Sequence, residues 1–238
     1  VFPVRAWVKE NGYLGLVGYD ATLGDLVFAS KTTTESEFAE WFRHLFLQSY
    51  GEHVDVIRQY LAEHNACLVC EVMLPTEDPH IIEYVQDRIV LLDIVHRQAE
   101  FAAVDQVERE RFAAMFGMET KRLAATLQTW EDFVTWYEQV QGLDYLYDGV
   151  PIEGFVIEDA QHWQVKAKLD YYSFWKRMRG VLDGLKAGRR PKRAAAYPYP
   201  EYEARVIAYM QGIPIDALAQ MSIIDVRRRW QREQEKAV

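Results

Sequence analysis

The first hundred residues consist of short apolar runs separated by polar turns, with two helical stretches between them. Runs rich in β-branched and aromatic residues and bounded by Gly, Asn or Asp are typical of strands. Apolar residues spaced three and four apart are typical of helices. The pattern predicts strands at Arg5–Val8, Tyr13–Tyr19, Asp25–Ser30, Ala66–Met73, Ile81–Tyr84 and Arg88–Val95, and helices at Glu35–Tyr50 and Val54–Glu63.

Helical spacing dominates residues 100–145 and the C-terminal part of the chain. In the former, Thr129 is a good N-cap for a helix at Glu131–Val140, because its hydroxyl can accept a hydrogen bond from the first turn. The other predicted helices are Glu108–Phe116, Asp170–Leu185, Glu201–Met210, Asp216–Met221 and Ile224–Lys236, with a linker at Ala187–Pro200. We therefore expect an α+β body with an antiparallel sheet over residues 1–172, followed by a small all-helical module over residues 173–238.

Residues 151–172 predict a β-hairpin, with strands Ile152–Glu158 and Trp163–Lys168 around a polar turn. A two- or four-residue loop centred on Ala160–Gln161 would place Glu153 opposite Lys168 and Phe155 opposite Lys166. Because side chains alternate along a strand, one face would then be a core face. Its members are Ile152, Gly154, Val156, Trp163, Val165, Ala167 and Leu169. The opposite face would bring two ammonium groups and a carboxylate together, which suits a phosphate with a metal ion nearby. An ordinary cross-strand salt bridge fits this hairpin equally well.

Composition indicates a soluble globular protein, since 50% of the 238 residues are hydrophobic and 26% are charged. No apolar run approaches the ~20 residues of a membrane helix, and no secretory signal opens the chain. Cys67 and Cys70 lie three apart on a predicted strand and point to opposite faces, so we expect core thiols and a reducing, cytoplasmic compartment. The first residue is Val1, which we interpret as the start of a fragment with part of the domain upstream.

The charge is distributed unevenly along the chain. The net charge is −9, yet residues 161–238 hold 16 Lys and Arg against 8 Asp and Glu. A polyanion is therefore expected to dock at the C-terminal third. An acidic domain with a basic helical tail is the simpler alternative.

Several charged residues occur at the edges of predicted strands, where Lys and Glu are poor β-formers and costly to bury alone. Four lysines and two carboxylates in such positions indicate one shared cleft. The residues concerned are Lys9, Lys31, Glu71, Glu153, Lys166 and Lys168.

In order along the chain, these residues resemble the motifs of covalent nucleotidyltransferases, and within them the ATP-dependent RNA ligases of the phage tRNA-repair type. Lys9-Glu10-Asn11-Gly12 resembles the nucleophile motif KxDG, and Ser30-Lys31 resembles the conserved-lysine segment that follows it. The later matches are LVCEVMLPT around Glu71, the hydrophobic strand Arg88–Val95, Glu153-Gly154-Phe155, and Lys166-Ala167-Lys168 followed by Asp170-Tyr171-Tyr172. The motifs are individually weak, but all of them occur in the family order.

The resemblance implies a nucleotidyltransferase fold and a three-step reaction. Lys9 would attack the α-phosphate of ATP, the AMP would pass to an RNA 5′-phosphate, and a 3′-hydroxyl would displace it, with tRNA as the expected RNA. A neutral amine is required for the attack, and neighbouring cations favour it. Lys166 and Lys168 would grip the α-phosphate, Glu153 would hold Mg²⁺ or Mn²⁺, and Glu71 would accept a hydrogen bond from the ribose. The other implied nucleotide-binding residues are Glu10, Asn11, Gly12, Lys31, Gly154 and Tyr172.

The sequence departs from the family pattern at three places. Asn11 stands where this branch usually has Asp, Tyr13 replaces a more usual Ser, and only eight residues precede Lys9. Two alternatives therefore stay open: another lysine nucleotidyltransferase, such as a DNA ligase or capping enzyme, and a non-catalytic RNA-binding relative.

The helical module matches such ligases in kind and predicts RNA contacts. Its cations would bind phosphates and its aromatic side chains would stack on bases. The cations are Lys176, Arg177, Arg179, Lys186, Arg189, Arg190, Lys192 and Arg193, and the aromatic residues are Trp175, Tyr197 and Tyr199. The alternative is a helical cap whose aromatic residues form its core.

Overall fold

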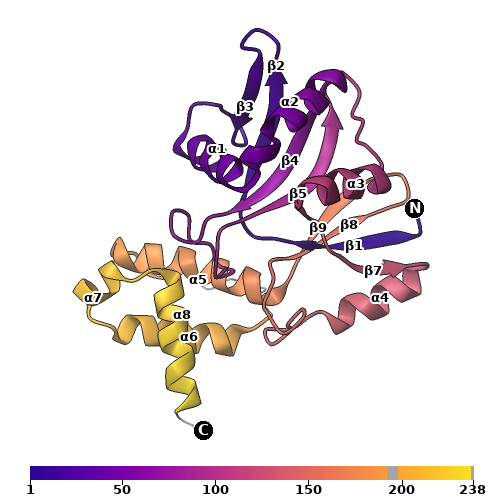
Figure 1. Cartoon of the computed structure of the whole chain (residues 1–238). Helices are drawn as coiled ribbons and strands as arrows, with labels where there is room; N and C mark the ends of the chain where they lie inside the picture. The colour runs from indigo at the N-terminus through magenta and orange to yellow at the C-terminus, as the bar shows by residue number, and fades with distance from the viewer. Residues whose placement is uncertain (192–197, 237–238) are drawn as a thin grey trace. The chain divides into compact units, whose positions relative to one another are not determined.

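The computed structural model describes residues 1–191 and 198–236, and its elements confirm the predicted α+β class (Figure 1). Two compact units are present. The first comprises Val1–Trp130 and Phe155–Lys166, and the second comprises Glu131–Gly154 and Ala167–Val238.

A five-stranded sheet of order β3-β2-β4-β5-β6 forms the centre of the first unit. Its strands pair antiparallel except β5 with β6, which are parallel. One face is covered by helices α1, α2 and α3, whose buried side chains join those of the sheet in a single core (Figure 1). The strands are β2 (Tyr13–Asp20), β3 (Asp25–Ala29), β4 (Ala66–Met73), β5 (Arg88–His96) and β6 (Glu119–Thr120), and the helices are α1 (Glu37–Tyr50), α2 (Val54–Glu63, preceded by the 3₁₀ turn Gly51–His53) and α3 (Gln106–Phe116).

Helix α1 shows how the sequence pattern produces this packing. It begins after Ser36, whose hydroxyl accepts a hydrogen bond from Ala39 N at 3.2 Å and so satisfies one donor of the first turn. Phe42 and Phe46, one turn apart, are fully buried and contact each other edge to face. Burying each ring contributes about 1.5–3 kcal/mol, so helix and sheet stabilise each other.

A second sheet has four strands in the order β7-β1-β8-β9. Its strands are β1 (Val4–Lys9), β7 (Leu123–Leu127), β8 (Gly154–Glu158) and β9 (Gln164–Lys168). The expectation that residues 100–145 are mainly helical was wrong for β6 and β7. The segment LAATL is rich in helix formers, but antiparallel pairing with β1 decides its conformation.

The predicted strand Ile81–Tyr84 was also wrong, because these residues form an irregular loop. Ile82 N and the Tyr84 hydroxyl bond to the loop after β1, as described below.

The β8–β9 hairpin is present, but its register differs by one residue from the expectation. Asp159 N donates to Trp163 O at 2.9 Å and Leu169 N donates to Glu153 O at 3.0 Å, so Leu169 rather than Lys168 lies opposite Glu153. The cause is a three-residue loop in which His162 adopts a left-handed conformation, with φ of 64°.

The predicted core face of the hairpin was wrong as well. Phe155 and Ile157, expected on the polar face, are buried, whereas Trp163 and Val165 are 78% and 61% exposed. Strand β8 is an inner strand between β1 and β9, while β9 forms the edge of the sheet. Position in the sheet therefore decides burial here more than alternation along the strand.

A buried ionic cluster surrounds the side chain of Glu158, the last residue of β8. The Glu158 carboxylate accepts hydrogen bonds from Trp7 Nε1 at 2.6 Å and His162 Nδ1 at 2.8 Å, and Lys121 Nζ lies 3.7 Å away. Burial alone would raise the pKa of Glu158, but these contacts outweigh it and lower the pKa.

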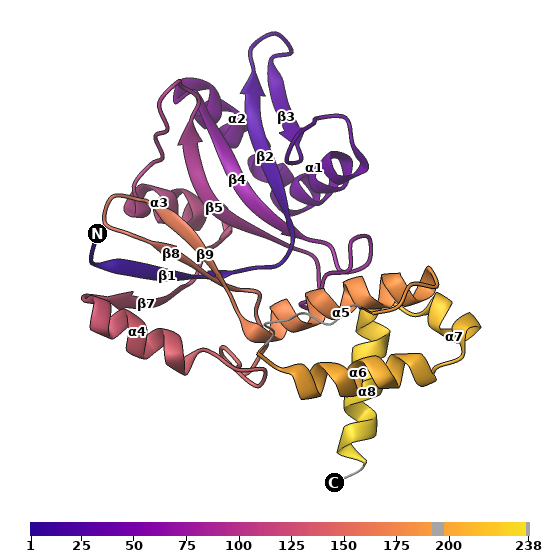
Figure 2. The same cartoon turned by 180° about the vertical axis from the view of Figure 1, so that it is seen from behind.

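The second unit is mostly helical, and it includes the C-terminal helices that the sequence predicts. Trp175 packs in its core at 2% exposure together with Phe174 and Trp230, so its predicted role in stacking on bases was wrong. Tyr199 is only partly buried, and its hydroxyl donates to Asp170. The predicted RNA contacts Lys192, Arg193 and Tyr197 lie outside the described residues. The helices are α4 (Trp130–Gln139), α5 (Asp170–Lys186), α6 (Pro200–Gly212), α7 (Ile215–Gln220) and α8 (Ile223–Glu235), which Figure 2 shows from behind.

Both cysteines are unpaired thiols. Cys70 is buried at the centre of β4, where burial raises its pKa, while Cys67 is partly exposed. None of the helices described is long and apolar enough to cross a membrane.

Candidate active site

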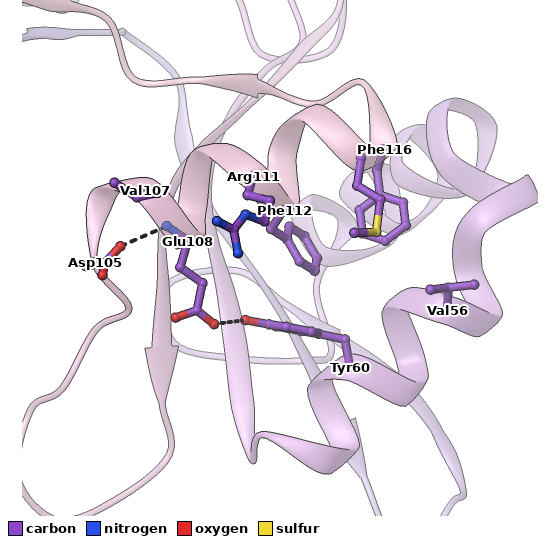
Figure 3. Close-up of a pocket in the computed structure, with 9 residues that line it drawn as sticks. Val56, Tyr60, Asp105, Val107, Glu108, Arg111, Phe112 and Phe116 are labelled. Atoms are coloured by element: carbon purple, nitrogen blue, oxygen red, sulfur yellow. Dashed lines mark hydrogen bonds between the residues drawn. The ribbon is translucent and has the colours of Figure 1, made fainter.

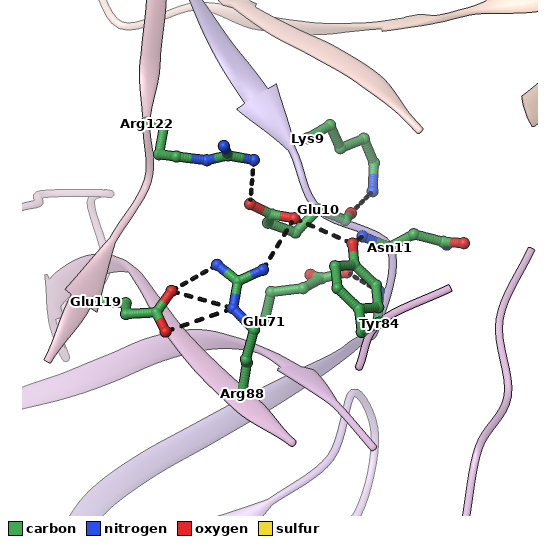
Figure 4. Close-up of polar contacts among 9 residues, drawn as sticks. Lys9, Glu10, Asn11, Glu71, Tyr84, Arg88, Glu119 and Arg122 are labelled. Carbon is green, nitrogen blue, oxygen red and sulfur yellow. Dashed lines mark hydrogen bonds and ion pairs between the residues drawn. The ribbon is translucent and has the colours of Figure 1, made fainter. Parts of the chain in front are cut away.

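The loop that joins β1 to β2 presents the predicted nucleophile. Lys9 is the last residue of β1, is partly exposed, and its Nζ donates to the carbonyl oxygen of Glu10 at 3.2 Å (Figure 4). The next three residues, Glu10, Asn11 and Gly12, are each held by a contact from another part of the first unit.

Glu10 is a buried carboxylate, 6% exposed, surrounded by donors. Arg122 Nη2 lies 3.0 Å from its Oε1, Tyr84 donates to its Oε2 at 3.0 Å, and Arg88 Nη1 lies 3.8 Å from the same oxygen (Figure 4). Arg88 also donates to Glu119 at 3.1 Å, and this hydrogen bond raises the pKa of Arg88. A buried charge is tolerated only when it is paired and hydrogen-bonded in this way.

Asn11 is fixed by the irregular loop that replaces the predicted strand. Its backbone N donates to the Tyr84 hydroxyl at 2.7 Å, and its side-chain Oδ1 accepts from Ile82 N at 3.1 Å. Burial raises the pKa of Tyr84, and the Glu10 charge raises it further, so the hydroxyl stays protonated.

Gly12 is held against β4. Its N donates to Glu71 Oε1 at 2.9 Å. A Cβ on Gly12 would lie 2.1 Å from the carbonyl oxygen of Val72, which no side chain can do without displacing backbone. Only glycine therefore allows this approach, and it brings Glu71 next to the loop that follows Lys9.

A second cluster of predicted residues lies in the second unit. Lys168 Nζ pairs with the buried Glu153 at 2.9 Å and lies 4.9 Å from the centre of the Tyr172 ring. Burial would lower the pKa of Lys168, but Glu153 outweighs this and raises it. Gly154 is required here, since a Cβ would lie 2.2 Å from Ala167 O.

Lys176, one turn beyond Tyr172 on α5, contacts the same ring at 5.7 Å. The nearby charge of Lys168 lowers the pKa of Lys176. Two ammonium groups near one aromatic ring repel each other, and an anion bound between them would relieve that repulsion.

Lys31 and Lys166 are both exposed, on the bend after β3 and on β9 respectively. Within the part of the chain that the structure describes, neither forms a hydrogen bond or ion pair with the two clusters.

Comparison with known proteins assigns the chain to a family. The family model described as RNA ligase matches residues 1–172, which is most of the chain. The chain belongs to this RNA ligase family. A search of curated proteins gave no match.

Solved structures similar to this RNA ligase family member show the same fold. An archaeal ATP-dependent RNA ligase superposes with a TM-score of 0.56 at 14% identity, covering 98% of this chain and 56% of the ligase. A candidate ATP-dependent DNA ligase from Aquifex aeolicus superposes with a TM-score of 0.54 at 14% identity, covering 99% of this chain and 62% of that protein. An RNA ligase of Naegleria gruberi with PPi gives 0.50 and 14%, covering 71% of this chain and 50% of that one. The chain thus spans between half and two thirds of the length of these proteins.

Sequence reasoning missed Tyr84, Arg88 and Arg122 as parts of the site of this family member. Tyr84 and Arg88 were assigned to strands, and Arg122 to a helical region. Each reaches Glu10 or Asn11 across more than seventy residues of sequence, so no local spacing identifies them.

The carboxylates fit a metal ion only in part. Among the described residues, no three His, Cys, Asp or Glu side chains gather closely enough to hold a metal by themselves. Mg²⁺ is commonly bound by one or two carboxylates together with substrate phosphates, and Glu153 offers one such carboxylate.

A separate pocket of about 420 Å³ lies between α2 and α3 (Figure 3). Its lining combines apolar side chains, such as Phe112 and Phe116, with polar ones, and among the latter Tyr60 donates to Glu108 at 2.9 Å. It contains none of the residues that the motifs single out.

Proposed function

We propose that this chain is the nucleotidyltransferase part of an ATP-dependent RNA ligase, acting in the cytoplasm on tRNA or other broken RNA. The proposal rests on the family match and on one observation, the lysine at the end of β1 followed by three residues that are each fixed by a contact. Such fixed geometry is what a nucleophile requires, because orientation supplies much of the rate of a bond-forming step.

In the first proposed step, neutral Lys9 Nζ attacks the α-phosphorus of ATP. A nitrogen–phosphorus bond forms, the bond from this phosphorus to the bridging oxygen breaks, and pyrophosphate leaves with the electron pair. The amine proton is released to solvent. The AMP then passes to an RNA 5′-phosphate, and a 3′-hydroxyl displaces AMP to seal the strand.

The charged residues take roles that match their chemistry. Lys166 and Lys168 bind phosphate oxygens and offset the charge that develops during transfer. Glu153 is the proposed ligand of Mg²⁺ or Mn²⁺, which would draw charge from the phosphates. A Naegleria gruberi RNA ligase variant of similar fold was solved with ATP and Mn.

Glu71 can hold the loop and the nucleotide together. A carboxylate has two oxygens and about four acceptor positions, so one such group can accept from both Gly12 N and a ribose hydroxyl. Tyr172 and Gly154 border the phosphate-binding lysine, and Lys31 is assigned to a phosphate or base contact. The Asn11 amide oxygen accepts from Ile82 N, a role that the Asp usual in this branch could also fill.

The test is a mass spectrum of the full chain after incubation with ATP and Mg²⁺. An adduct of AMP mass is expected in the wild type and in the control Lys236→Ala, which changes an exposed lysine, and its absence is expected in Lys9→Ala. No adduct in the wild type, or an equal adduct in Lys9→Ala, would overturn the proposal and favour the non-catalytic RNA-binding alternative.

Two further incubations separate the related enzymes. An adduct formed with GTP instead of ATP would indicate a capping enzyme. Sealing of nicked DNA in preference to a nicked RNA stem-loop would indicate a DNA ligase.

A further inference from the structure

Residues 82–84 lie against the two residues that follow Lys9. Three hydrogen bonds join them: Ile82 N to Asn11 Oδ1, Asn11 N to the Tyr84 hydroxyl, and the Tyr84 hydroxyl to Glu10 Oε2, at 3.1, 2.7 and 3.0 Å. Figure 4 shows the Tyr84 ring beside Glu10 and Asn11.

The Tyr84 hydroxyl acts on one particular peptide group. The hydroxyl oxygen accepts a hydrogen bond from the N–H of Asn11. That N–H shares a peptide plane with the carbonyl of Glu10, and this carbonyl accepts from Lys9 Nζ at 3.2 Å. Because a peptide group is rigid and planar, rotation of this plane moves both atoms together. Tyr84 therefore fixes the orientation of the carbonyl that holds the Lys9 amine.

The same hydroxyl is itself anchored from the other side. It donates its only proton to the Glu10 carboxylate, which Arg122 holds at 3.0 Å. A phenolic hydroxyl can donate and accept at once, so one group ties the side chain of residue 10 to the backbone of residue 11. Phenylalanine would keep the ring and lose both contacts.

We infer that Tyr84 is a positioning residue for the Lys9 amine, acting through the peptide between residues 10 and 11. This inference rests on the proposed function, because it assumes that Lys9 is the nucleophile. By this inference, residues 82–84 contribute to the adenylation step. They do not contribute to the later sealing step, because Lys9 is not the attacking group there.

The test compares Tyr84→Phe with Tyr60→Phe, a matched change that removes a tyrosine hydroxyl bonded to Glu108 in the separate pocket. Single-turnover AMP transfer to the protein is measured at saturating ATP, together with ATP affinity. A misplacement of about 1 Å can cost up to ~100-fold in rate. We expect Tyr84→Phe to slow adenylation by about 10- to 100-fold relative to Tyr60→Phe, with ATP affinity unchanged.

Joining of a pre-adenylated RNA separates positioning from a general defect. This reaction bypasses Lys9, so Tyr84→Phe is expected to perform it as Tyr60→Phe does. Equal adenylation rates in the two variants would overturn the inference, as would an equal loss in both reactions or a change confined to ATP affinity. Absence of adduct in the wild type would instead reject the proposed function.

Discussion

Replacing Gly12 with alanine tests whether the close approach of the nucleophile loop to β4 is required. The new Cβ would lie 2.1 Å from the carbonyl oxygen of Val72 and 2.8 Å from its carbonyl carbon. Contacts below 3.0 Å essentially never occur for real Cβ atoms, so the loop or the strand must move by about 0.9 Å. Both atoms belong to the backbone of an inner strand, which cannot turn aside as a side chain would.

The expected cost combines two effects. Overpacking of a well-packed site costs about 1–3 kcal/mol, and loss of the hydrogen bond from Gly12 N to the charged Glu71 costs about 1.5–3 kcal/mol. For a chain of this size each kcal/mol lowers the melting temperature by about 2–4 °C. We expect Gly12→Ala to lower the melting temperature by at least about 5 °C and to slow adenylation by moving Lys9.

The matched control is Gly18→Ala on β2. There the nearest atom to a new Cβ is the Nη1 of Arg97 at 3.9 Å, and alanine is the better strand residue. Thermal unfolding by calorimetry and the rate of AMP adduct formation are measured for both variants. If Gly12→Ala matches Gly18→Ala within about 2 °C and within twofold in rate, the steric argument is refuted.

Two further predictions concern single charged residues. Because the contacts of Glu158 lower its pKa, its stabilising effect is complete above the unfolded pKa of ~4.3 and is lost as the pH falls through the folded value. Urea unfolding should therefore show Glu158→Gln to be less stable by about 1.5–3 kcal/mol at pH 7, with the difference shrinking toward pH 3.5; a constant difference would contradict this. If Lys176 binds an RNA phosphate, Lys176→Ala should reduce the slope of log affinity for a 5′-phosphorylated oligonucleotide against log salt by about 0.7. Arg58→Ala, which removes a partly exposed cation paired with Asp55 in the first unit, should leave the slope unchanged.

The sequence pattern predicted those elements whose residues repeat with a clear period. Strand β4 and helix α2 have the predicted bounds, because β4 is a short apolar run that begins after the polar Asn65 and the apolar residues of α2 recur at helical spacing. Strand β7 was not predictable from its composition, since Leu and Ala favour helix and only pairing with β1 makes it a strand. The hairpin register depended on the backbone conformation of His162, which no apolar pattern encodes.

The site was predictable to a smaller extent. The order of short motifs singled out Lys9, Gly12 and Glu71, and the structure brings the loop that holds the first two against the strand that holds Glu71. The contacts of Tyr84 and Arg122 with Glu10 join segments separated by 74 and 112 residues. Such contacts arise from the packing of the sheets, so spacing along the chain does not indicate them.

The two unpaired thiols of β4 supply an internal reporter of how often this sheet opens. Cys70 is enclosed between β2 and β5 with 1% exposure, whereas Cys67 is reached more easily from the surface. An alkylating reagent therefore modifies Cys67 from the native state, but modifies Cys70 only in molecules whose strands have separated. The labelling rate of Cys70, compared with that of the same thiol in the unfolded chain, converts to the free energy of local opening at the strand that supports Gly12 and Glu71, with no probe added to the chain.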